Sequence, residues 1–188
     1  MRKITVSVII AVTAVAGAWT SYGWSTNQPS VAKDPNEPGS QYISAFLATI
    51  KESDEITVTE HSNKWDYLRP DRSQDGYKEK IYQVVQVTSS QKEKLVDILS
   101  SLPTRTQDAF PACIFEPHHR IEFRNRGSLI GTMEICFACG QIEWQGSLQT
   151  PPWSIYGGMA NFVTELGLHP KADWSSKFES PPSESPAK

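Results

Sequence analysis

The residues best suited to chemistry lie in one stretch, 111–143, which holds all three cysteines of the chain and two of its four histidines. Within it, C-x-x-C followed by glycine is a spacing that lets two thiolates meet one metal ion, as in structural zinc sites. A third cysteine lies upstream, with two histidines five and six residues beyond it. The candidate zinc ligands are therefore Cys113, His118, His119, Cys136 and Cys139.

The same cysteines also fit a disulfide, and an odd number leaves one sulfur over in an oxidising compartment. Three pairings are open, and the sequence does not choose among them. We favour a disulfide that stabilises a β-meander, with no cofactor. A protein that binds zinc, for structure or for function, is the first alternative.

Enzymatic use of the cysteines is the second alternative. Thiol redox catalysis needs the first cysteine of C-x-x-C at a helix N-terminus, where the thiol pKa is lowered. Here the motif falls between two predicted strands. Nucleophilic catalysis by Cys113 with His118, His119 or His169 has no local signature, because such groups assemble only in space. We predict a non-enzymatic protein and assign no catalytic residue.

The elements that position the cysteines are predicted strands. The apolar and polar residues of the stretch alternate as in half-buried strands, with turns between them. Two further strands with the same alternation or with β-branched composition precede it. The predicted strands are Glu55–Glu60, Ile81–Val87, Arg120–Asn125, Leu129–Phe137 and Gln141–Gln145.

Three segments show apolar residues at the i, i+3, i+4, i+7 spacing of a helix that buries one face. Ser40 and the pattern Ser90-Gln-Lys-Glu93 are their expected N-terminal caps. The apolar positions are Ile43, Phe46, Leu47 and Ile50; Leu95, Ile98, Leu99 and Leu102; and Met159, Phe162, Val163 and Leu166. We therefore predict an α+β fold, an antiparallel sheet of about five strands with three helices packed on one face, in a single domain over residues 40–170.

The two ends of the chain look different from this domain. Residues 1–18 have the basic start, apolar run and small-residue cleavage site of a signal peptide. An uncleaved anchor over residues 4–24 is the alternative. Residues 19–39 are predicted to be a disordered linker, and the Ser/Pro/Glu-rich residues 171–188 a disordered tail. We expect a periplasmic or secreted protein, or one held at the membrane by its N-terminal segment.

The charge of the chain limits its partners. The formal net charge is −3, and no block of basic residues is present. Nucleic-acid binding is therefore not expected, and membrane contact is expected only through an uncleaved N-terminal segment. The sequence identifies no partner.

The pattern Cys113-x3-Pro-His-His-Arg-Ile followed by Ile-Cys136-Phe-x-Cys139 resembles one found in uncharacterised small bacterial exported proteins. The order of the elements around it is also similar. The resemblance implies a bacterial origin and no particular activity. It also implies that Cys113, His119, Cys136 and Cys139 belong together as a unit.

Overall fold

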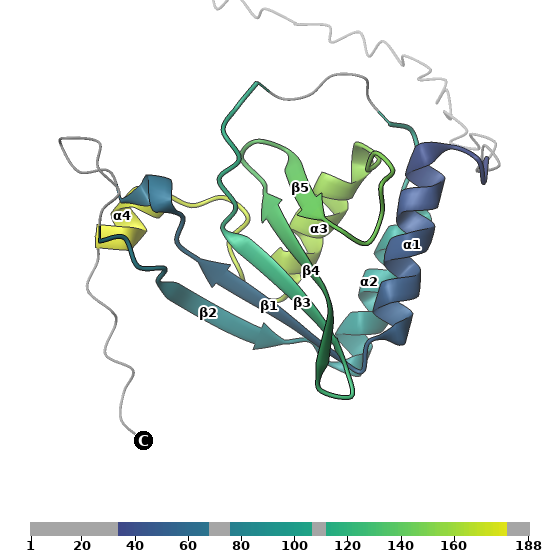
Figure 1. Cartoon of the computed structure of the whole chain (residues 1–188), viewed down its shortest axis with the longest axis horizontal. Helices are drawn as coiled ribbons and strands as arrows, with labels where there is room; N and C mark the ends of the chain where they lie inside the picture. Colours follow the sequence, from purple (N-terminus) through teal and green to yellow (C-terminus); the bar gives the residue numbers. More distant parts are fainter. Residues whose placement is uncertain (1–33, 68–75, 107–111, 180–188) are drawn as a thin grey trace, which may run out of the picture. The chain divides into compact units, whose positions relative to one another are not determined.

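Five antiparallel strands form one sheet in the order β2-β1-β3-β4-β5 (Figure 1). This computed structural model describes residues 34–67, 76–106 and 112–179. The strands are β1 (Glu55–His61), β2 (Ile81–Gln86), β3 (His119–Asn125), β4 (Ser128–Cys136) and β5 (Gln141–Trp144). The five predicted strands are therefore confirmed, with ends that differ by one residue at most.

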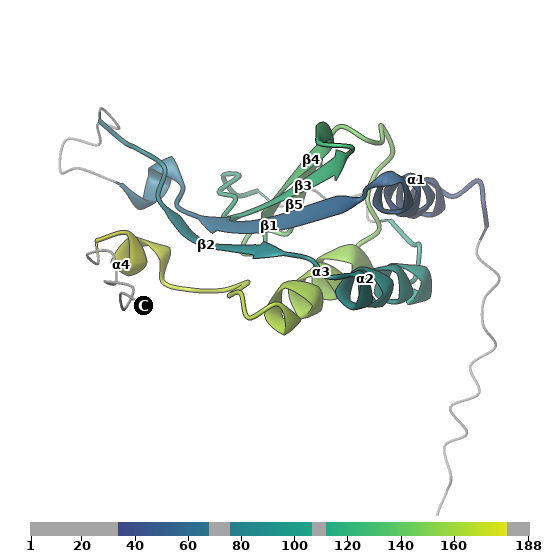
Figure 2. The ribbon, with the colours of Figure 1, turned by 90° about the horizontal axis from the view of Figure 1, so that it is seen from below.

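Three helices cover one face of the sheet: α1 (Pro38–Glu52), α2 (Ser89–Ser101) and α3 (Ser154–Glu165). Figure 2 shows α2 and α3 on the same side of the strands. From α1, Phe46 meets Phe123 of β3 edge to face, with ring centroids 5.8 Å apart. The predicted α+β architecture is confirmed.

Side-chain alternation decides which residues of the strands face the helices. In β1, Ile56 and Val58 are buried, and in β3 Ile121 and Phe123 are buried. The strands are paired so that these residues lie side by side, Ile56 with Phe123 and Val58 with Ile121. The next residues of the same face are the polar pair Glu60 and His119, also aligned and buried. The core therefore changes from apolar to polar toward one end of the sheet.

The helix starts differ from the predicted caps. The side chain of Thr88, rather than Ser90, caps α2 and exchanges hydrogen bonds with Gln91. The first helix begins at Pro38, before the expected cap Ser40. Proline fits a first helical turn because its missing N–H has no helical partner there.

A short helix, α4 (Trp174–Glu179), lies within the segment that the sequence analysis assigned to a disordered tail. It is held by aromatic contacts. Trp174 stacks on His118 with ring centroids 4.4 Å apart, and Phe178 lies 5.3 Å from Tyr67, beside the 3-10 helix η1 (Lys64–Asp66). The sequence analysis did not expect this helix, which brings two aromatic side chains, one helical turn apart, half-buried against the end of the sheet.

Several predictions fall outside the described residues: the signal peptide over 1–18, the anchor over 4–24, and residues 19–33 of the linker. Within residues 34–67, 76–106 and 112–179, no helix has both the length and the apolar character needed to cross a membrane.

Candidate functional site

Cys136 and Cys139 are joined by a disulfide at the bend between β4 and β5. Both residues are buried, and the backbone N–H of Cys139 donates to Sγ of Cys136 over 3.2 Å. Gly140 continues the bend with φ of 59°, a left-handed conformation that glycine adopts without strain. The disulfide therefore closes the turn of the hairpin.

The third sulfur lies beside this bridge. Cys113 is exposed and not disulfide-bonded, and its Sγ donates to the carbonyl oxygen of Cys139 over 3.6 Å. The three cysteines thus lie together at the β4–β5 bend, and we call them the disulfide corner. Of the three pairings that the sequence left open, the structure has Cys136–Cys139.

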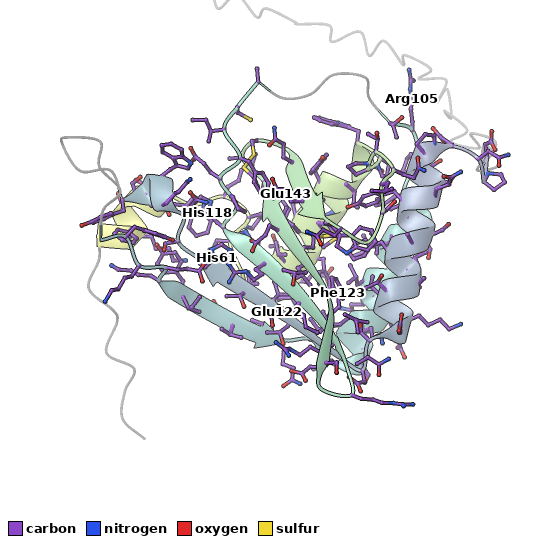
Figure 3. All side chains as sticks on the ribbon, in the orientation of Figure 1. His61, Arg105, His118, Glu122, Phe123 and Glu143 are labelled. Carbon is purple, nitrogen blue, oxygen red and sulfur yellow. A yellow bond between two sulfur atoms is a disulfide. The ribbon has the colours of Figure 1, made fainter. Side chains whose placement is uncertain are left out.

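The two neighbouring histidines face other partners. Nε2 of His118 lies 3.0 Å from a carboxylate oxygen of Asp66, and its ring stacks on Trp174. His119 turns toward the helix-covered face, where its ring meets Phe137 edge on. Figure 3 shows His118 near His61, at the end of the sheet that lies toward α4. No hydrogen bond joins a histidine to a sulfur in the described part of the chain.

The predicted zinc ligands do not gather into one set. Across residues 34–67, 76–106 and 112–179, no group of three or more His, Cys, Asp or Glu side chains is placed to hold a metal ion. In the structure, Cys136 and Cys139 share a covalent bond instead of offering two thiolates.

A second group of ionisable residues lies at the same end of the sheet, on the helix-covered face, around Glu60. The carboxylate of Glu60 accepts hydrogen bonds from the backbone N–H and from Nδ1 of His169, over 2.8 Å and 3.2 Å. Lys177 of α4 forms an ion pair with its other oxygen. We call Glu60, Tyr82, His119, His169 and Lys177 the Glu60 cluster.

Glu60 is charged although its side chain is only 1% exposed. Burial raises the pKa of this carboxyl, but the hydrogen bonds from Lys177 and His169 outweigh burial, so the pKa lies below its usual value. An ionised carboxylate only accepts hydrogen bonds, so Nδ1 of His169 carries the proton. The Nε2 atom of His169 is then the ring nitrogen left for another partner.

His119 is neutral. Burial is the main cause that lowers its pKa, to about 3, and Glu60 opposes this only in part. Its Nε2 lies 3.9 Å from the nearer Glu60 oxygen, too far for a hydrogen bond. Neither ring nitrogen has a hydrogen-bond partner among the described residues, and the same holds for the hydroxyl of Tyr82. Burial also raises the pKa of Tyr82 to about 12.

The opposite, outer face of the sheet carries an ion-pair network. Arg120 donates to Glu79 over 2.8 Å and 3.1 Å, and also to Glu134. Nε2 of His61 lies 3.2 Å from the other oxygen of Glu134. The hydrogen bonds from Arg120 are the largest cause that lowers the pKa of Glu79. All four residues find charged or polar partners within the network, as expected of a structural network on a sheet face.

Sequence reasoning missed the Glu60 cluster, although part of it has a signal. Glu60 continues the alternation of Ile56 and Val58, which predicts a buried acid, and His119 likewise precedes Ile121 and Phe123 at the same parity. His169 and Lys177 have no such signal, because they reach Glu60 from 109 and 117 residues away.

Comparison of the chain with protein-family models, with curated proteins and with solved structures finds no match. The functional argument therefore rests on the residues themselves.

Proposed function

We propose that the chain is an exported, non-enzymatic protein whose β4–β5 hairpin is stabilised by the Cys136–Cys139 disulfide. The observation that carries this proposal is the buried disulfide at the bend, beside a third cysteine that remains free. Structural disulfides persist outside the reducing cytoplasm. The signal-peptide pattern of residues 1–18 and the resemblance to small bacterial exported proteins support the same location.

A stabilising role fits the place of the disulfide better than a catalytic one. The C-x-x-C lies between two strands and not at a helix N-terminus, where a helix would activate its first thiol. Both sulfurs belong to buried residues, whereas a catalytic disulfide must be reached by its substrate thiol. The exposed Cys113 donates to a backbone carbonyl rather than to a histidine base.

The loop that this disulfide closes is short, since its cysteines are three positions apart in the sequence. Loop-closure entropy then predicts a contribution of about 2 kcal/mol to the free energy of unfolding. The covalent bond is a local clamp on the turn, and the apolar core supplies most of the stability.

Fractionation of cells that express the full chain tests this proposal. We expect the protein in the periplasm or the medium, with a mass that lacks residues 1–18, and elemental analysis of that material should find no zinc. Protein in the membrane fraction at full mass would support the anchor over residues 4–24 instead. Cytoplasmic protein, or zinc near one ion per chain, would contradict the proposal.

A further inference from the structure

The short helix α4 is docked on buried polar atoms that lack hydrogen bonds. Both ring nitrogens of His119 and the hydroxyl of Tyr82 are shielded from solvent and have no hydrogen-bond partner among the described residues. Trp174 of α4 contacts both side chains. Its ring stacks on Tyr82 with centroids 6.1 Å apart and meets His119 edge on at 5.8 Å. Because a buried polar atom without a partner is unfavourable, these groups would gain hydrogen bonds from water if α4 were displaced.

His119 differs in its partners from the other three histidines of the chain. Each of those three has a carboxylate oxygen within 3.2 Å. The pairs are His61 with Glu134 at 3.2 Å, His118 with Asp66 at 3.0 Å, and His169 with Glu60 at 3.2 Å. Nε2 of His119 lies 3.9 Å from Glu60, whose two oxygens already bind His169 and Lys177. A proton on His119 therefore has no carboxylate of its own, whereas a proton on another histidine is matched by one.

The surroundings of His119 oppose a positive charge. Burial is the largest cause that lowers its pKa, so exposure of the ring returns the pKa toward its ordinary value of 6.5. Glu60 of β1 favours the charged ring, whereas His61, His118 and Lys177 oppose it. Lys177 belongs to α4, so displacement of α4 removes a cation from the neighbourhood of the ring and hydrates it. Protonation of His119 and displacement of α4 therefore favour each other.

The helix α4 is also the element whose release disturbs the fold least. It has six residues, and a helix of that length is not stable by itself in water. Figure 2 shows it at the other end of the strands from α2 and α3. Its contacts are the rings of Trp174 and Phe178, the ion pair of Lys177 with Glu60, and a hydrogen bond from Lys80 to the carbonyl oxygen of Phe178. Local opening of such a segment requires less free energy than unfolding of the sheet.

We propose that α4 is an acid-released latch: in mildly acidic solution His119 takes up a proton, α4 leaves the end of the sheet, and Glu60 and Tyr82 become exposed while the sheet stays folded. The change is reversible, because no covalent bond forms or breaks. At neutral pH His119 loses its proton and Lys177 pairs with Glu60 again. The latch does not depend on the proposed role of the disulfide.

Hydrogen exchange of the full chain at pH 7 and pH 5, corrected for the intrinsic exchange rates, tests the proposal. If His119 has its ordinary pKa of 6.5 in the open state, opening becomes about 25-fold more favourable between these pH values. We expect the protection of Trp174–Glu179 to fall by that factor, while β1 stays protected. In His119→Phe the fall should be less than about threefold, because phenylalanine does not titrate.

Two more variants complete the test. His169→Gln is the matched control, since it removes a histidine that has a carboxylate partner, and it should keep the full fall. His119→Gln, a smaller side chain that does not titrate, replaces His119→Phe if that variant does not fold. The proposal is overturned if wild-type α4 is equally protected at both pH values, or if the folded variant at position 119 shows the full fall. It is also overturned if His169→Gln abolishes the fall, or if β1 exchanges together with α4.

Discussion

The disulfide corner and the Glu60 cluster lie at the same end of the sheet but hold it in different ways. The disulfide links residues three positions apart and fixes one turn. The Glu60 cluster joins β1 to the segment after α3 and to α4 through one buried carboxylate. A disulfide constrains its turn whatever surrounds it. A buried carboxylate stabilises the fold only while its hydrogen-bond and ion-pair partners stay in place. The comparison predicts that loss of Glu60 lowers the free energy of unfolding more than loss of the disulfide does.

The largest expected effect is that of Glu60→Ala. The variant removes a buried charge on which Lys177 and His169 both converge, and loss of one partner of a buried pair costs about 3 kcal/mol. The free energy of unfolding from urea titration measures it. Glu122→Ala on the outer face, which breaks a half-exposed pair with Arg124, is the control and should cost less than 1 kcal/mol. Equal losses in the two variants would refute the ranking.

Removal of the disulfide should have the next largest effect. Cys136→Ser with Cys139→Ser should lower the free energy of unfolding by about 2 kcal/mol, because the unfolded chain is no longer cross-linked. Reduction of the wild-type protein should give the same loss. Cys113→Ser is the matched control, and we expect a change within about 0.5 kcal/mol because its side chain is exposed. A loss in the double variant above that of Glu60→Ala would reverse the comparison.

The third prediction concerns pH. His119 has a folded pKa of about 3 against an ordinary value of 6.5, so between these values the unfolded chain binds the extra proton. Stability should therefore fall as the pH drops below 6.5, by up to about 1.4 kcal/mol per unit. The lowered pKa of Glu60 changes the stability only when the pH falls below 4.5, the usual pKa of this carboxyl. Glu60 therefore does not contribute to the change between pH 7 and pH 5.

Unfolding measured at pH 7 and pH 5 in wild type and in His119→Phe isolates this contribution. Phenylalanine keeps an aromatic ring beside Phe137 and Trp174 and does not titrate. We expect a smaller loss between the two pH values in the variant, by about 2 kcal/mol. The same loss in both proteins would mean that His119 is not the buried neutral group described above.

The smallest expected effect is that of Lys177→Ala. The Lys177 side chain is 31% exposed, and without it Glu60 still accepts two hydrogen bonds from His169, so the loss should be about 1 kcal/mol and confined to α4. Hydrogen exchange should show faster exchange in Trp174–Glu179 with little change in β1. Lys94→Ala, which breaks an exposed pair with Glu165, is the control and should leave α4 protected. If α4 keeps its protection in Lys177→Ala, aromatic contacts alone hold it.

The fold was predictable from the sequence because its strands and helices carry clear periodicities. The alternation of Ile56 and Val58 and the helical spacing of Met159, Phe162 and Val163 predict the buried faces that the structure shows. The disulfide between Cys136 and Cys139 was one of the three pairings that three cysteines allow, and it joins the two that are close in the sequence. Local patterns of this kind hold because neighbours in sequence remain neighbours in space.

The Glu60 cluster could not be assembled in the same way. Its cation comes from α4, in a segment whose composition predicts disorder, and its histidine from the loop after α3. The parity of Glu60 and His119 predicts that both are buried. It does not predict that Lys177 neutralises Glu60, or that the ring nitrogens of His119 have no hydrogen-bond partner among the described residues. Non-local partners depend on the path of the whole chain, which periodicity does not contain.

The pairing of the cysteines is the most direct test of the central claim. Protein from the periplasm or the medium is alkylated without reductant, then reduced, alkylated with a second reagent, and mapped by peptide mass spectrometry. We predict the first label on Cys113 alone and the second on Cys136 and Cys139. The first label on all three cysteines, or a bridge that includes Cys113, would contradict the claim that this disulfide stabilises the hairpin of an exported protein.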